Sequence, residues 1–183
     1  MKCKVVAITG KIASGKSTVC SYLKSKGFVV VDCDKIAKEV LHQETVKQKV
    51  QNLLGENAYC NGFLNTKYVA DVVFNDESLL SEYNDLVNLG VKEQIEIAQN
   101  NCQQPLLFCE IARLDAFEFS WHQIWVVKTE KTNVLVRSEN RNVDYVEKVF
   151  HLQKDFLGTL TLTNDGTPLD LYGQVDVALA NLV

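Results

Sequence analysis

The chain has 183 residues, of which 46% are apolar and 23% are charged. This composition is typical of one globular domain that buries about two thirds of its unfolded surface. The formal net charge of -4 gives no positive field that would attract a polyanion, so we expect no nucleic-acid partner. No apolar run reaches the roughly 20 residues that cross a bilayer, and no signal sequence precedes the first strand pattern. We therefore expect no membrane partner and a cytoplasmic location.

Short apolar runs rich in β-branched residues alternate along the chain with segments of helical period. Strands are predicted at residues 4–9, 28–32, 106–109, 124–128 and 160–163. Helices are predicted at residues 17–24, 35–41, 45–54 and 77–98, and from 168 toward 182. Residues 129–157 form a charged helical pair with few apolar side chains, which we interpret as a lid. The alternation predicts an α/β domain with a five-stranded parallel sheet covered by helices on both faces.

The most specific motif lies between the first predicted strand and the first predicted helix. Its sequence, GKIASGKST, matches the pattern G-x-x-x-x-G-K-[ST] of a phosphate-binding loop. Glycines let successive backbone N–H groups point into one concavity, where the helix N-terminus adds partial positive charge. We expect Lys16 to reach the β- and γ-phosphates of a nucleotide, and the Ser17 hydroxyl to hold Mg²⁺. The predicted nucleotide-binding residues of this loop are Gly10, Lys11, Ile12, Ala13, Ser14, Gly15, Lys16, Ser17 and Thr18.

Two acids, Asp32 and Asp34, follow the second strand at the edge of the sheet where ligands of such folds bind. Because side chains alternate along a strand, both carboxylates are expected to point the same way, toward the phosphate loop. A carboxylate there would take the proton of an attacking hydroxyl or hold a metal-bound water. The alternative is that one or both acids cap the helix that follows. No N-K-x-D motif supports a preference for guanine.

The stretch ITGKIASGKSTVCSYLKSKGFVVVDCDKIAKEV resembles the opening of the dephospho-coenzyme A kinase family, in which the second strand ends in D-x-D-x-I-A. The later stretch LLGENAYCNGFLNTKYVADVVFND and the turn Thr163-Asn164-Asp165-Gly166 are similar to further elements of that family. The resemblance implies a P-loop kinase architecture. It also implies a helical acceptor-binding insertion at about residues 55–100 and a helical lid at about residues 129–157.

The same resemblance implies ATP-dependent phosphorylation of the ribose 3′-hydroxyl of dephospho-CoA, the last step of coenzyme A synthesis, with ATP and Mg²⁺ as cofactors. The residues it assigns are Lys16, Asp34 and Arg137 for catalysis, Arg141 and Asn164 for the nucleotide, and Asp32 with Asp34 for the acceptor. Gln153 is a candidate for the family's lid glutamine. Independently of the family, Glu110 follows an apolar strand, and two interpretations stay open: an ordinary charge at a strand end, or a residue that holds a water on Mg²⁺.

The chain departs from the family at positions expected to bind the acceptor. Asn88-Leu89 stands where the family has a His-Pro pair, and Thr66 and Ala70 stand where it has arginines. Two further hypotheses therefore stay open. One is a related P-loop kinase with another small hydroxyl acceptor, and the other is a nucleotide-binding homologue without turnover.

Overall fold

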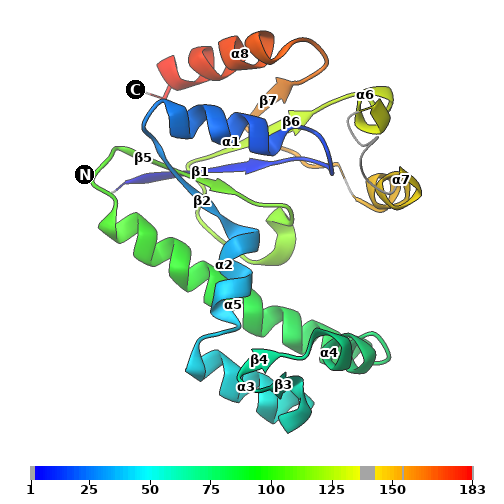
Figure 1. Cartoon of the computed structure of the whole chain (residues 1–183). Helices are drawn as coiled ribbons and strands as arrows, with labels where there is room; N and C mark the ends of the chain where they lie inside the picture. Colours follow the sequence, from blue (N-terminus) through cyan, green and yellow to red (C-terminus); the bar gives the residue numbers. More distant parts are fainter. Residues whose placement is uncertain (1–2, 137–142, 154, 183) are drawn as a thin grey trace. The chain divides into compact units, whose positions relative to one another are not determined.

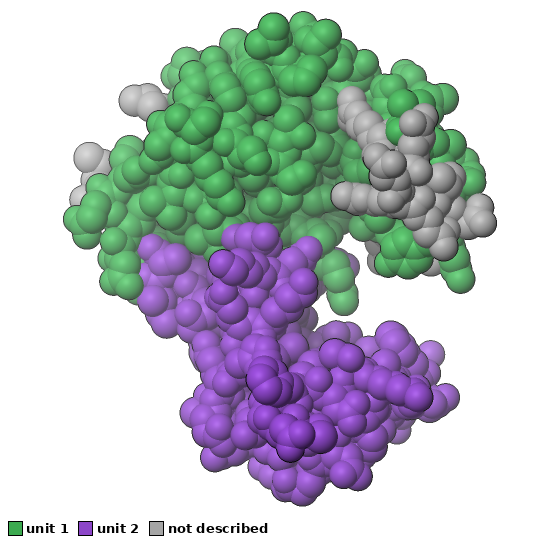
Figure 2. Space-filling model, viewed as in Figure 1, with its two compact units in different colours: residues 1–31, 99–114, 120–183 green, residues 32–98, 115–119 purple. Residues whose placement is uncertain are grey.

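The computed structural model describes residues 3–136, 143–153 and 155–182, and the chain forms two compact units (Figure 2). Unit 1 comprises residues 1–31, 99–114 and 120–183. Unit 2 comprises residues 32–98 and 115–119. The predicted phosphate loop lies in unit 1, whereas the predicted acid pair lies at the start of unit 2.

Unit 1 is built on a five-stranded sheet with the strand order β2-β5-β1-β6-β7 (Figure 1). The strands are β1 (Lys4–Thr9), β2 (Val29–Asp32), β5 (Leu106–Glu110), β6 (Gln123–Lys128) and β7 (Leu160–Thr163). β1 pairs in parallel with β5 and β6, and β6 pairs in parallel with β7. The predicted parallel α/β fold is therefore confirmed, and each predicted strand end lies within one residue of the observed end.

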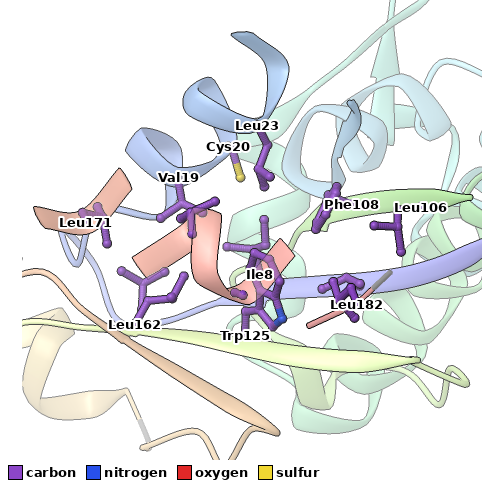
Figure 3. Close-up of a cluster of buried hydrophobic side chains, with 14 residues drawn as sticks. Ile8, Val19, Cys20, Leu23, Leu106, Phe108, Trp125, Leu162, Leu171 and Leu182 are labelled. Atoms are coloured by element: carbon purple, nitrogen blue, oxygen red, sulfur yellow. The ribbon is translucent and has the colours of Figure 1, made fainter. Parts of the chain in front are cut away.

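Both faces of the central strand are buried. Val6 and Ile8 of β1 point to one face and Val5 and Ala7 to the other, and none of the four side chains is more than 1% exposed. Two-sided burial is the condition under which a parallel strand is apolar throughout instead of alternating. On the face of Ile8, the helices α1 (Lys16–Ser25) and α8 (Pro168–Ala180) add Val19, Leu23 and Leu171 to the core (Figure 3).

Two further helices of unit 1, α6 (Lys131–Val136) and α7 (Val143–Leu152), lie within the predicted lid. An ion pair between Lys131 and Glu147 joins them, and the hydrogen bond from Lys131 lowers the pKa of the Glu147 carboxyl. α8 starts at Pro168, as predicted, because Thr167 and Asp170 form a capping box around its first turn.

Unit 2 is mainly helical. Its elements are α2 (Cys33–Val40), α3 (Glu44–Leu54), a 3-10 helix (Glu56–Ala58), β3 (Tyr59–Cys60), β4 (Phe63–Leu64), α4 (Thr66–Val73) and most of α5 (Glu77–Asn101). Its core includes Val40, Val50 and Val69, and the hydroxyl of Tyr68 ties α4 to the end of α3 by donating to the Leu54 carbonyl at 2.8 Å. None of the helices in the described part of the chain has both the length and the apolar content to cross a membrane.

The β3-β4 hairpin and α4 were not among the predicted elements. The hairpin turns through Asn61 and Gly62, whose φ angles of 51° and 83° are those that a two-residue turn requires. The Asn-Gly pair was therefore the available sequence signal, but each of the two strands has only two residues and shows no periodicity. Asn65 caps α4 by accepting the N–H of Tyr68 at 3.2 Å.

Candidate phosphate-binding site

Residues 10–15 form the loop between β1 and α1, and α1 begins at Lys16, so that Lys16, Ser17 and Thr18 form its first turn. Two positions of the loop admit only glycine. Gly10 has φ +151°, and a Cβ added to it would lie 2.3 Å from the carbonyl oxygen of Val127. Gly15 has φ +103°, and a Cβ there would lie 2.0 Å from Nδ2 of Asn164. At both positions the backbone has a positive φ and lies very close to a neighbouring residue, and a side chain would prevent both.

The Lys16 ammonium lies over the loop itself. Its Nζ donates to the carbonyl of Gly10 at 2.8 Å and to that of Lys11 at 3.1 Å. No side chain of the described residues caps α1, so its first turn offers backbone N–H groups and partial positive charge to an anion. Ser17 is an exposed residue in the same turn. The arrangement is cationic and concave, and suits a polyphosphate.

Asn164 lies directly against this loop. The side chain is buried, and its Nδ2 donates to the carbonyl of Ser14 at 2.8 Å. The backbone N–H of Asn164 donates to the carbonyl of Lys128 at 2.8 Å, and its carbonyl accepts the Thr129 hydroxyl at 2.9 Å. The ends of β6 and β7 are therefore joined to each other and to the phosphate loop through one residue. The structure thus brings Asn164, singled out from the sequence, together with residues 10–18.

Asp32 and Asp34 differ in their surroundings. Asp32 ends β2 and is the N-cap of α2, where its Oδ1 accepts the N–H of Lys35 at 3.0 Å. Asp34 is already helical, so the expectation that strand alternation points both carboxylates the same way is wrong: the cap at Asp32 ends the strand two residues earlier. The Asp34 side chain is exposed, and within the described residues its carboxylate has no hydrogen bond or ion pair.

Of the other residues singled out from the sequence, the structure describes some and not others. Arg137 and Arg141 lie outside the described residues. The Gln153 side chain accepts the backbone N–H of Ile12 at 2.6 Å, which brings it onto the phosphate loop. Glu110 ends β5 and is paired in register with Ile8 of β1, one residue before Thr9 ends that strand.

At the positions where the sequence departs from the family, the structure explains one substitution. Asn88 of α5 donates from Nδ2 to the carbonyl of Ala116 at 2.9 Å, and so joins residues 115–119 to this helix within unit 2. Its neighbour Leu89 is 50% exposed. Thr66 and Ala70 both lie in α4. Nothing in the structure explains Leu89, Thr66 or Ala70.

Sequence reasoning missed several groups beside the loop. Lys11 forms an ion pair with Asp155 at 3.1 Å, and its ammonium lies 4.8 Å from the centre of the Phe150 ring. No motif announces these contacts, because their members are more than a hundred residues apart in the chain. Within the described residues, the buried hydroxyls of Thr9 and Ser14 have no hydrogen-bond partner. Thr9 ends β1 and Ser14 lies in the loop, so both hydroxyls lie close to the candidate site.

Comparison with known proteins gives the site a context. The family model described as Dephospho-CoA kinase matches residues 4–154, a span that includes the phosphate loop and the acid pair. A protein of Staphylococcus epidermidis named Dephospho-CoA kinase is 34% identical over 150 residues, which cover 76% of this chain and 71% of the relative.

Two solved structures resemble the whole chain. The crystal structure of TT1252 from Thermus thermophilus superposes with a TM-score of 0.84 at 26% identity and covers 100% of both chains. The structure titled dephospho-CoA kinase from Campylobacter jejuni has a TM-score of 0.66 at 18% identity, and covers 97% of this chain and 96% of its own. The second likeness shows a shared fold.

The contact between Asn164 and the loop leads to a prediction about the stability of the protein. Replacing Asn164 by Asp keeps the shape of the side chain but removes the amide donor, so the carbonyl of Ser14 loses its partner and faces a carboxylate. We expect the free energy of unfolding to fall by about 1–3 kcal/mol, the cost of an unpaired buried polar group. Urea denaturation measures this loss. Asn57→Asp, the same change at an exposed position, should stay within about 0.5 kcal/mol; equal losses in the two variants would contradict the assigned role of Asn164.

Proposed function

Because the chain belongs to the dephospho-CoA kinase family, we propose that it uses ATP to phosphorylate the ribose 3′-hydroxyl of dephospho-CoA, the last step of coenzyme A synthesis. The phosphate loop carries the nucleotide half of this proposal, because Lys16 and the α1 N-terminus surround a concave backbone. The acceptor half is supported by the family match, which extends over residues 4–154. A cytoplasmic location is part of the same proposal.

Lys16 stabilises the transferring phosphoryl group. Transfer spreads negative charge over the phosphoryl oxygens, and catalysis depends on positioning and on neutralising that charge. In the structure the ammonium of Lys16 already lies over the loop, held by the carbonyls of Gly10 and Lys11. It exchanges these neutral oxygens for charged phosphate oxygens, with which its hydrogen bonds are stronger.

The residues around the loop suit Mg²⁺ bound together with the nucleotide. Ser17 presents its hydroxyl in the first turn of α1, and Glu110 ends the strand paired with β1. Among the described residues no group of three or more His, Cys, Asp or Glu side chains gathers in one place. The phosphates and water would therefore supply most of the ligands, as Mg²⁺ prefers. When bound, the ion supplies charge neutralisation between the phosphates.

Asp34 is the proposed general base. Asp32 is committed to capping α2, whereas the Asp34 carboxylate is exposed and has no partner within the described residues. A carboxylate with open lone pairs is able to orient the acceptor hydroxyl and take its proton. We assign Asp34 to catalysis, and Asp32 both to the shape of the acceptor side and to the helix start.

The arginine roles rest on the family resemblance. Arg137 would clamp the transferring phosphoryl group and Arg141 would assist at the nucleotide, both on a lid that spans about residues 129–157. The helical insertion at about residues 55–100 would bind the acceptor.

The proposal is tested by incubating the protein with Mg-ATP and separate acceptors, and reading the products by mass. The panel contains dephospho-CoA, nucleoside monophosphates and shikimate. We expect one phosphoryl group to be added to dephospho-CoA alone. Phosphorylation of a different acceptor would favour the related small-molecule kinase, and binding of ATP without any product would favour the homologue without turnover.

Lys16→Ala should abolish phosphoryl transfer without unfolding the protein. Loss of one preorganised charge at a transition state commonly lowers turnover by about 100-fold to 1,000-fold. Turnover with saturating dephospho-CoA measures this change, and circular dichroism checks the fold. Lys24→Ala, an exposed lysine in the last turn of the same helix, is the control and should turn over like the parent. Near-normal turnover of folded Lys16→Ala would contradict the assignment of this loop to ATP.

The variant Asp34→Asn tests whether Asp34 acts as a general base or only as a helix-capping residue. Asparagine keeps the shape of the side chain but does not take a proton, so kcat should fall by roughly 100-fold or more while ATP affinity changes little. Asp32→Asn is the internal comparison: asparagine caps helices as well as aspartate does, so stability should be retained and kcat should fall much less than in Asp34→Asn. Calorimetry measures ATP binding, and product formation measures kcat. If Asp32→Asn is inactive and Asp34→Asn is not, the two roles are reversed.

A further inference from the structure

Three contacts fasten the end of α7, and the residues after it, to the phosphate loop. On the side of the loop, these contacts involve Lys11 and Ile12. On the other side they involve Phe150, Gln153 and Asp155, and we call these three residues the strap. Gln153 accepts the N–H of Ile12 at 2.6 Å, Asp155 pairs with the Lys11 ammonium at 3.1 Å, and the Phe150 ring lies 4.8 Å from that ammonium. The strap thus makes one neutral hydrogen bond, from the Ile12 N–H to Gln153. Its other two residues, Phe150 and Asp155, both contact the Lys11 ammonium.

The ion pair between Lys11 and Asp155 is weak, so the Lys11 ammonium is able to exchange Asp155 for another anion. The Lys11 side chain is 21% exposed and that of Asp155 is 81% exposed. Exposed ion pairs contribute little, because water solvates both charges. Lys11, Phe150 and Asp155 also line a hollow of about 90 Å³ that borders Gly10. The ammonium therefore has open space beside the loop in which to change its partner.

Lys11 stands where a bound triphosphate would compete for it. Its own carbonyl accepts a hydrogen bond from the Lys16 ammonium at 3.1 Å, so its backbone lies beside the group assigned to the phosphates. Charges interact over about 8–10 Å at physiological salt. A polyphosphate on the loop therefore acts on Lys11 at short range, and carries more negative charge than the single carboxylate of Asp155.

We propose that the Lys11 ammonium is shared between Asp155 and the triphosphate of the nucleotide, so that Asp155 lowers the affinity for ATP by holding Lys11 away from it. By linkage, bound ATP weakens the pairing of Lys11 with Asp155 by the same factor. The hydrogen bond from the Ile12 N–H to Gln153 is a second contact between the strap and the loop, and it does not involve the Lys11 ammonium. Lys11 is thus a nucleotide-affinity residue, and Asp155 is a positioning residue that acts through it. This inference rests on the proposed use of ATP at this loop.

The test is a double-mutant cycle that measures binding of a non-hydrolysable ATP analogue with Mg²⁺ by calorimetry. Asp155→Asn should lower the Kd by about two- to fivefold, the range of an exposed ion pair. Lys11→Met keeps most of the length of the side chain but removes its charge, and should raise the Kd by a similar factor. In the Lys11→Met background, Asp155→Asn should change the Kd much less, because the charge for which it competes is gone. All these differences should shrink in 1 M salt.

A matched control is available at the other end of α1. Asp176 pairs there with Lys26 at 2.8 Å, in a second lysine-aspartate pair within unit 1. Asp176→Asn should leave the Kd of the ATP analogue unchanged.

Two results would overturn the inference. The first is an unchanged Kd in Asp155→Asn. The second is an equal gain from that substitution with and without Lys11, which would make Asp155 an independent charge. The failure of the proposed function is distinguishable from both, since it would appear as no analogue binding, or no phosphorylation of dephospho-CoA, by the parent protein.

Discussion

Asn164 packs on Gly15 so closely that a Cβ at position 15 would lie 2.0 Å from its amide nitrogen. The same amide donates to the carbonyl of Ser14, so the residue that follows β7 fixes the shape of the loop that follows β1. The carbonyls of Gly10 and Lys11 are in turn placed where the Lys16 ammonium reaches them. The anion site therefore depends on a contact between two segments that are 150 residues apart in the chain.

The two acids after β2 show how adjacent residues of one type take different roles. A helix start leaves backbone N–H groups without intrahelical partners, and one nearby carboxylate is enough to satisfy part of that need. Asp32 meets it, and this leaves Asp34 exposed and uncommitted. The requirement for a cap thereby separates a structural acid from the proposed catalytic one.

The two lysine ammonium groups at the phosphate loop each have nearby oxygen partners. Lys16 is turned onto loop carbonyls, and Lys11 is paired with Asp155. Both lysines are thus held by partners that bind them more weakly than phosphate oxygens would, because a neutral carbonyl and an exposed carboxylate hold an ammonium loosely. Such a loop is ordered before the nucleotide arrives and still exchanges its partners at little cost.

The sequence by itself determined the parallel sheet, most of its helices and the phosphate loop, because each is encoded in neighbouring residues: apolar runs at β1 and β6, and the fixed spacing of Gly10, Gly15 and Lys16. It did not reveal the β3-β4 hairpin, whose strands are too short to show a period. The sequence left open whether Asp32, Asp34 or both cap α2, and the structure decided for Asp32. Only the tertiary structure showed that Gln153 accepts the Ile12 N–H and that Lys11 meets Asp155. The cap depends on where the strand ends, and the other two contacts join residues more than a hundred positions apart. Hydrogen bonds and ion pairs between such distant residues leave no periodic trace in the sequence, since they exist only once the sheet has brought the ends of its strands together.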